Sequence, residues 1–379
     1  MSRRLSALLA LVCLGGAVAA TPGASARPLP TPPPGFFGIA PQAGLTVADV
    51  SYMKAGGIES IRWPLSWSSI QPTRKGGYDW SGFDQAVEVA ARAGLSILPS
   101  INSTPRWVAA KETTMPIDTA RQRAAWTAFL RAAVERYGPG GEFWTERGQE
   151  RRIEGPEGVT YVPAIPAAEP IRAWQIWNES NFFYFAYPVS PSRYGKLVTI
   201  SSQAIKSVSP GARVILSGLF GKPTAGGRRG MPAATFLRQL YRYPGIKSRF
   251  DGVSLHPYAV DSEMLEELVE EFHEVLVENH DRPAFYITEM GWGSQSNFQH
   301  DAFEQGPQGQ ARELRSSYEF LLANQRRLNL RGVYWFSWRD LAGSCDFCDS
   351  VGFFREGKRF QPKPAWRVFV RLSGGRPRP

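Results

Sequence analysis

The sequence predicts an α/β fold, a single-domain (β/α)8 barrel of the TIM type, for the region from residue 36 to residue 373. Short apolar runs alternate there with amphipathic helical stretches, which is typical of parallel strands joined by crossover helices. The cycle repeats eight times with little variation, whereas an open, doubly wound sheet rarely stays so regular. No shift in composition marks a second domain, so we expect one closed barrel.

Each predicted strand is a short apolar run that is followed by polar, ionisable or aromatic residues. The eight runs, in chain order, are Phe36–Ile39, Ser60–Trp63, Ser96–Ile101, Ile171–Trp177, Arg213–Ser217, Gly252–Leu255, Ala284–Thr288 and Gly332–Ser337.

Each predicted helix has apolar residues at helical spacing, as in the sixth, where Leu265, Leu268 and Phe272 share one face. Thr46 and Ser190 are suitable N-terminal caps for the first and fourth helices. The eight helices are Thr46–Ala55, Phe83–Ala93, Thr119–Tyr137, Pro191–Ser207, Ala233–Arg242, Glu263–Glu278, Gln310–Gln325 and Pro364–Leu372.

Two segments interrupt this cycle. Pro139–Pro170 is rich in Gly, Glu, Arg and Pro and follows the third helix, so we expect a β-hairpin or surface excursion on the face opposite the active site. Lys222–Met231 follows the fifth strand, so we expect it on the face where barrel enzymes carry their active sites.

The N-terminus has the pattern of a signal peptide over residues 1–26. Arg3 and Arg4 precede an apolar run, and Ala24-Ser25-Ala26 fits a cleavage site. We therefore expect a secreted, extracellular protein, with a retained anchor as the alternative. No other stretch is apolar enough to span a membrane, so we expect no membrane association after cleavage. A Pro-rich lead-in is expected at 27–35 and a short tail at 374–379.

Cys345 and Cys348 are the two cysteines that remain after such a cleavage. In an oxidising compartment a C-x-x-C pair favours a disulfide over a metal site. A zinc site would need two further ligands, and no His lies within 40 residues.

The formal net charge of +10 falls to +8 once the signal peptide is removed. A basic surface suits an anionic glycan, an acidic cell wall or nucleic acid, but the charge also serves solubility alone. The arginines are scattered and no nucleic-acid-binding motif is present, so we expect no nucleic-acid partner. The oligomeric state is left open.

The carboxyl ends of the predicted strands carry the residues that suggest chemistry, because barrel active sites are built there. Burying a carboxylate is costly unless it has partners, so acids at such positions indicate a role. Two opposed carboxylates suit glycoside hydrolysis, in which one attacks the sugar and the other protonates the leaving oxygen. The residues at these ends are Arg62, Asn102, Asn178, Glu179, His256, Tyr258, Glu289, Trp292 and Trp338.

The remaining polar residues fit supporting roles around that pair. Arg62 would keep one carboxylate ionised, and Tyr258 would donate a hydrogen bond. Asn178 suits the sugar 2-hydroxyl, and Trp338 suits the floor under the ring. His256, Trp292 and Asn102 are further candidate substrate contacts, with ordinary packing as the alternative for each.

At these positions the chain resembles the retaining glycoside hydrolases of clan A. Trp177-Asn178-Glu179 is similar to the Asn-Glu signature of the clan, and Thr288-Glu289 with Gly291-Trp292 is similar to its nucleophile strand. The chain looks closest to the cellulase-like family 5 and the β-xylosidase-like family 39. The resemblance implies a glycosidase with Glu179 as acid/base, Glu289 as nucleophile, an oligo- or polysaccharide substrate of plant- or cell-wall type, and no cofactor or metal; the signal-peptide pattern adds secretion.

The chain departs from the clan pattern at two positions. Ser180 stands where a proline usually follows Asn-Glu, and Asn102 lies where several cellulase-like members carry a His. Thr104-Pro105-x-Trp107 is closer to xylosidase- and arabinofuranosidase-like relatives, which favours hemicellulose-type or arabinose-containing glycans. A metal-dependent hydrolase is disfavoured because the chain has only four His. A non-catalytic glycan-binding barrel of the same fold is the alternative.

Overall fold

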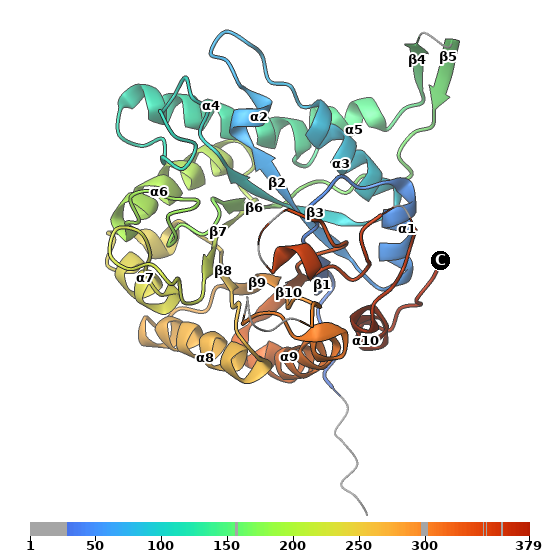
Figure 1. Ribbon diagram of the computed structural model, residues 1–379. Helices are drawn as coiled ribbons and strands as arrows, with labels where there is room; N and C mark the ends of the chain where they lie inside the picture. Colours follow the sequence, from blue (N-terminus) through green and yellow to red (C-terminus); the bar gives the residue numbers. More distant parts are fainter. Residues whose placement is uncertain (1–28, 156–157, 297–301, 344, 346, 358) are drawn as a thin grey trace, which may run out of the picture.

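The computed structural model describes residues 29–155, 158–296, 302–343, 345, 347–357 and 359–379. Eight parallel strands close into a barrel in the order β1-β10-β9-β8-β7-β6-β3-β2 (Figure 1). All eight predicted strands are present, so the predicted TIM barrel is confirmed. The barrel strands are β1 (Phe37–Ile39), β2 (Ser60–Ser66), β3 (Ser96–Asn102), β6 (Ala173–Ile176), β7 (Arg213–Phe220), β8 (Gly252–His256), β9 (Ala284–Met290) and β10 (Leu330–Trp335).

The helices surround the barrel and begin where the sequence places their caps. Thr46 and Thr119 each form a reciprocal capping box, and Ser190 caps a helix that has Pro191 in its first turn. The helices that match the eight predicted ones are α1 (Val47–Ala55), α3 (Ser81–Arg92), α4 (Ala120–Tyr137), α6 (Pro191–Val208), α7 (Ala233–Leu240), α8 (Ser262–Glu278), α9 (Gly306–Leu328) and α10 (Pro364–Ser373). Shorter helices are α2 (Trp67–Ile70), α5 (Glu142–Arg147), η1 (Ile246–Ser248) and η2 (Cys348–Ser350).

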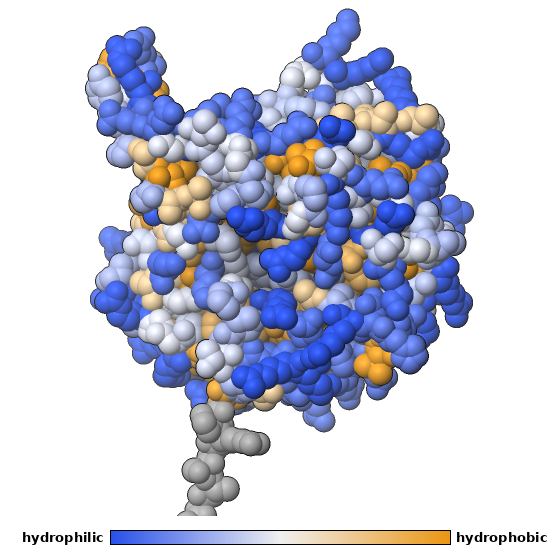
Figure 2. Space-filling model, turned by 180° about the vertical axis from the view of Figure 1, so that it is seen from behind, coloured by the Kyte–Doolittle hydropathy of each residue, from blue (hydrophilic) through white to orange (hydrophobic). Residues whose placement is uncertain are grey.

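The excursion between α4 and β6 contains a hairpin, as predicted. Strands β4 (Arg151–Gly155) and β5 (Gly158–Val162) pair antiparallel and form a sheet separate from the barrel. The hairpin extends away from the body of the molecule (Figure 1) and is also visible as a projection from behind, where most of the surface is hydrophilic (Figure 2).

Apolar side chains fill two regions. The larger cluster lies between the strands and the helices, and a smaller cluster combines residues of four strands with Ala40 after β1. In the smaller cluster, Leu98, Ile215, Tyr286 and Tyr334 come from β3, β7, β9 and β10, which places them in the barrel interior. The carboxyl end of the barrel is instead lined by buried polar residues, which is where the chemistry is expected.

The chain ends pack onto the barrel where they are described. Gln325 donates to the Pro30 carbonyl at 2.9 Å, and Trp366 donates to the Pro377 carbonyl at 3.1 Å. The predicted signal peptide, residues 1–26, lies outside the described residues. Among the helices that are described, none combines the length and apolar character needed to cross a bilayer.

Candidate active site

Four strands bring the predicted polar residues to one end of the barrel. Arg62 lies in β2, Glu289 lies in β9, and His256 ends β8. Glu179 follows β6 by a few residues and is buried. One carboxylate oxygen of Glu179, one carboxylate oxygen of Glu289 and one ring nitrogen of His256 all lie within 4.8 Å of one another. The two carboxylates are therefore close enough to act on one bond.

Glu289 is held by two donors on opposite sides. Arg62 Nη1 lies 2.5 Å from Oε1, and the Tyr258 hydroxyl donates to Oε2 at 2.8 Å. Burial alone would raise the pKa of Glu289, but the imidazole of His256, the charge of Arg62 and the Tyr258 hydroxyl outweigh it, so the pKa is lowered. Burial and the neighbouring Glu289 raise the pKa of Tyr258 well above its usual value, which keeps it a donor. Glu289 is thus kept ionised.

Glu179 has the opposite electrostatic environment. Its side chain is 7% exposed, and this burial raises the pKa of the carboxyl despite a 2.8 Å contact with His256 Nδ1. The charge of Glu289 raises the pKa further, whereas Arg62 acts in the other direction. Two adjacent carboxyl groups with pKa values displaced in opposite directions are suited to different roles in acid–base chemistry.

Arg62 also links the site to the interior of the barrel. Its Nη2 donates to Asn178 Oδ1 at 2.6 Å, and its Nε donates to Gln175 Oε1 at 2.6 Å. Asn178 therefore lies beside the cation, and its amide oxygen is held by it. A buried charge with several hydrogen-bond partners is held in one orientation.

Gln175 continues this network to His256. Because its oxygen accepts from Arg62, its amide nitrogen must donate, and it reaches Ser254 Oγ at 2.6 Å and Thr288 Oγ1 at 3.1 Å. Among the described residues, the remaining partner for the Thr288 hydroxyl proton is His256 Nε2 at 3.0 Å. His256 Nε2 is then the acceptor, so Nδ1 carries the hydrogen that points toward Glu179.

Two features of the backbone make room for this arrangement. A Cβ atom at Gly218 would lie 1.9 Å from His256 Nε2 and 2.6 Å from Thr288 Oγ1, so only glycine allows the two side chains to meet. Trp177 and Glu179 both have positive φ, at 71° and 38°. Such strain in non-glycine residues costs about 1–3 kcal/mol each and is common at functional sites.

The structure corrects the predicted positions of two tryptophans. Trp338 is 2% exposed, donates to Asp49 Oδ1 at 2.8 Å and packs on Trp366 of α10, outside the barrel mouth. Trp292 is 1% exposed and packs on Trp335. The prediction that Trp338 lies under the sugar is therefore wrong, and Trp292 presents no open face to a substrate. The sequence shows that a tryptophan follows a strand, but not the side to which it points.

Phe336 lies where Trp338 was expected. It directly follows β10, is half-buried, and its ring is 6.2 Å from that of Tyr258, whose hydroxyl binds Glu289. Asn102 ends β3 and is half-buried, and its Oδ1 accepts from Ser103 Oγ at 2.7 Å. Phe336 is a site residue that the sequence reasoning missed, although its place at a strand end was the available signal.

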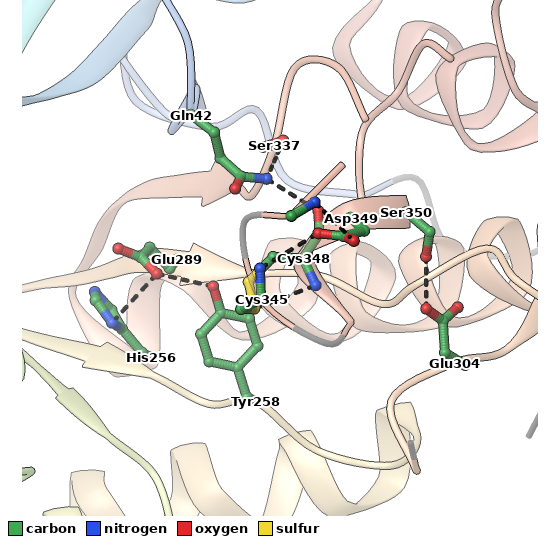
Figure 3. Close-up of a disulfide and its surroundings, with 11 residues drawn as sticks. Gln42, His256, Tyr258, Glu289, Glu304, Ser337, Cys345, Cys348, Asp349 and Ser350 are labelled. Carbon is green, nitrogen blue, oxygen red and sulfur yellow. Dashed lines mark hydrogen bonds and ion pairs between the residues drawn. A yellow bond between two sulfur atoms is a disulfide. The ribbon is translucent and has the colours of Figure 1, made fainter. Parts of the chain in front are cut away.

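A disulfide loop lies against the same tyrosine. Cys345 and Cys348 are joined, as the sequence predicts, in the segment after β10. Phe347 within this loop has its ring 5.2 Å from that of Tyr258. Figure 3 shows Tyr258 between Glu289 and the disulfide, so the loop supports the residue that hydrogen-bonds Glu289.

The cluster of Glu179, His256 and Glu289 has a spacing that would also allow it to hold a cation. The guanidinium of Arg62 already lies 2.5 Å from Glu289, and a metal ion in the cluster would meet this like charge. The donor set therefore fits a metal ion poorly, whereas it fits proton transfer.

Comparisons with known proteins point to one group of enzymes. A family model described as beta-galactosidase, of glycoside hydrolase family 42, matches residues 42–133, from the loop before α1 into α4. No curated protein sequence matches the chain.

Solved structures share the whole barrel. A family 39 glycoside hydrolase from Bacteroides cellulosilyticus WH2 is similar with 19% identity and a TM-score of 0.61, over 90% of this chain and 64% of that one. A monomeric beta-xylosidase from Caulobacter crescentus CB15 has 16% identity and a TM-score of 0.59, over 91% of this chain and 69% of that one. Xylanase 10B from Thermotoga maritima has 14% identity and a TM-score of 0.58, over 89% of this chain and 94% of that one.

These structural likenesses show the fold, and this chain spans less than two thirds of the Bacteroides structure. The family match covers 42–133, which is about a quarter of the chain and ends before Glu179 and Glu289. Both findings agree with the resemblance to clan A glycoside hydrolases that the sequence predicts, and the solved structures confirm the barrel that these enzymes share.

Proposed function

We propose that this protein is a clan A glycoside hydrolase that cleaves its substrate with retention of configuration, by double displacement, with Glu289 as nucleophile and Glu179 as acid/base. One observation carries the proposal. The two carboxyl groups have oxygens within 4.8 Å of each other and pKa values displaced in opposite directions. Retaining enzymes need a separation of about 5–5.5 Å, whereas inverting enzymes leave room for a water molecule at about 6.5–9.5 Å.

In the first step, ionised Glu289 attacks the anomeric carbon, and the bond to the leaving oxygen breaks. Arg62 and Tyr258 hold both oxygens of Glu289, so one lone pair on the carboxylate can face the sugar. Glu179, protonated because its pKa is raised, donates its proton to the leaving oxygen. The products are a glycosyl ester on Glu289 and a free leaving group.

In the second step, Glu179 is ionised and removes a proton from water, which attacks the glycosyl ester. The Nδ1 hydrogen of His256 stabilises Glu179 in this form at 2.8 Å. Loss of the sugar returns the charge to Glu289, where Arg62 neutralises it. The anomeric carbon has been inverted twice, so the configuration is retained.

The substrate we propose is a β-linked glycan of plant- or cell-wall type, with hemicellulose preferred. The half-buried Phe336 beside Tyr258 supports a sugar with a flat apolar face. The names of similar proteins include beta-galactosidase and beta-xylosidase, and both sugars have such a face. The signal-peptide pattern of residues 1–26 supports secretion, which suits an extracellular polymer.

Two variants test the roles. Purified enzyme is first assayed on aryl β-xyloside, β-glucoside, β-galactoside and α-arabinofuranoside. On the preferred sugar, Glu179→Ala should retain activity toward good leaving groups and be rescued by azide, with a glycosyl azide of retained configuration. Glu289→Ala should be inactive on all of them. The reverse behaviour would exchange the roles, an inverted product would reject retention, and inactive wild-type protein would favour a glycan-binding barrel.

A further inference from the structure

Three aromatic side chains are exposed directly after Glu179. Tyr184 is 64% exposed, Tyr187 43% and Phe185 40%. Among the described residues, the other aromatic side chain exposed to this degree is Tyr161, at 60%, on the β4–β5 hairpin. Exposed aromatic groups that gather at one place mark binding surfaces more often than scattered ones do. We call Tyr184, Phe185 and Tyr187 the aromatic ledge.

The backbone of the aromatic ledge is fixed by hydrogen bonds to three other segments. Phe183 N donates to Arg229 O at 2.8 Å, and Tyr187 N donates to Thr113 O at 3.1 Å. Trp177 Nε1 donates to Phe185 O at 2.8 Å. The loop is thus tied to the loops after β7 and β3 as well as to β6, so binding to it needs little ordering.

The ring of Tyr184 is held by its neighbours. It stacks on Phe183 with centroids 4.3 Å apart, and Phe182 meets it edge-on at 4.9 Å. The Arg229 guanidinium lies 4.1 Å from the centroid of Phe183. One face of Tyr184 is therefore covered, and with 64% of the residue exposed the remainder is open to a ligand.

A continuous series of rings joins the aromatic ledge to the nucleophile. Phe182 lies 5.3 Å from Phe220, and Phe220 lies 5.6 Å from Tyr258, whose hydroxyl binds Glu289. The ledge is therefore the outer end of a wall that begins at the catalytic pair. A ligand that extends outward from the scissile bond along this wall would reach it.

The direction of the wall indicates which part of the substrate reaches the ledge. Glu179 protonates the leaving oxygen, and the ledge begins five residues after Glu179 in the same loop. We propose that the aromatic ledge binds a sugar on the leaving-group side of the scissile bond, and that the substrate is therefore an oligo- or polysaccharide. This inference rests on the proposed function. Lys111, 5.7 Å from the ring centroid of Tyr187, and Arg229 favour a neutral or acidic sugar over a cationic one.

The test compares substrates that differ only in the leaving group. Xylobiose and galactobiose release a sugar, whereas β-xylosyl fluoride and β-galactosyl fluoride release an ion too small to reach the ledge. Tyr184→Ala should lower kcat/KM for the active disaccharide by about tenfold, or about 1.4 kcal/mol, and leave the fluoride unchanged. Tyr184→Phe keeps the ring and should behave as the wild type. Tyr161→Ala is the matched control, an equally exposed tyrosine remote from the site.

A binding measurement separates this inference from the proposed function. Calorimetry with β-1,4-xylotetraose and β-1,4-galactotetraose on Glu289→Gln protein needs no turnover. Tyr184→Ala in that background should weaken binding of the preferred tetrasaccharide about tenfold, and Tyr161→Ala should not. The proposed role of the aromatic ledge is wrong if Tyr184→Ala lowers kcat/KM equally for the fluoride and the disaccharide, or lowers it for neither. It is also wrong if neither tetrasaccharide binds to the Glu289→Gln protein. If the wild-type protein hydrolyses none of these substrates but binds a tetrasaccharide in a way that depends on Tyr184, the catalytic proposal is wrong. The aromatic ledge would then still be a sugar-binding surface.

Discussion

Replacing Thr288 with valine tests the hydrogen-bond network behind the acid/base. Thr288 is fully buried, accepts from Gln175 Nε2 at 3.1 Å and contacts His256 Nε2 at 3.0 Å. Valine keeps the shape of the side chain but removes the hydroxyl. Gln175 Nε2 keeps Ser254 Oγ at 2.6 Å and the Leu216 carbonyl at 3.3 Å as acceptors, so the substitution leaves the Nε2 acceptor of His256 without its partner.

The size of the effect follows from that one atom. A buried polar group without a partner costs about 1–3 kcal/mol, so Thr288→Val should lower the free energy of unfolding by about that amount. The kinetic effect is separate. Without Thr288, His256 can carry its hydrogen on Nε2 and present a lone pair to Glu179. The pKa of Glu179 then rises further, because the protonated carboxyl donates a hydrogen bond to His256 Nδ1 and gives up its proton less readily.

The assay is kcat/KM as a function of pH, with urea denaturation beside it. We expect activity to fall about tenfold, a fraction of the 100- to 10,000-fold that general acids contribute, and the alkaline limb to move to higher pH. Thr288→Ser keeps the hydroxyl and should keep the wild-type profile. If the valine and serine variants have the same pH profile, the assigned tautomer of His256 is wrong, whatever their stabilities.

Further predictions follow from the same site. Activity needs Glu289 ionised and Glu179 protonated, so kcat/KM plotted against pH should be bell-shaped. Glu289 should give an acid limb below pH 4.5 and Glu179 an alkaline limb above pH 4.5. A profile with one limb would contradict the assigned roles. Tyr258→Phe removes a donor that lowers the pKa of Glu289, so the acid limb should move to higher pH, and an unchanged limb would show that the hydroxyl does not act on the nucleophile. Reducing the Cys345–Cys348 disulfide should lower kcat severalfold without unfolding the barrel by circular dichroism, and a double alanine variant should show the same loss and no response to reductant.

The sequence predicted the barrel well because its signals were periodic. Strand runs and helical stripes each depend on local spacing, and their order alone required a closed parallel sheet. The end of β9 could be located for the same reason, and with it Glu289. Glu179 and Glu289 were found by their position at strand ends, and the structure brings them together.

The direction of side chains could not be read in the same way. Register shifts occur between Leu330 and Gly332 and between Val333 and Trp335 in β10, so simple alternation does not hold up to Trp338. Gln175 and Thr288 were overlooked because each lies within a strand. Their polar side chains in otherwise apolar runs were the available signal, since buried polar groups in strands need partners.

The β4–β5 hairpin has a practical consequence for anyone who wishes to modify the protein. It forms its own two-stranded sheet, apart from the barrel, in the connection between α4 and β6, so it lies at the end of the barrel opposite the catalytic pair. Peptide segments inserted at exposed loop tips are generally tolerated, because few buried contacts are lost. A surface anchor or an affinity tag placed between β4 and β5 would leave the catalytic end of the barrel facing outward from a solid support.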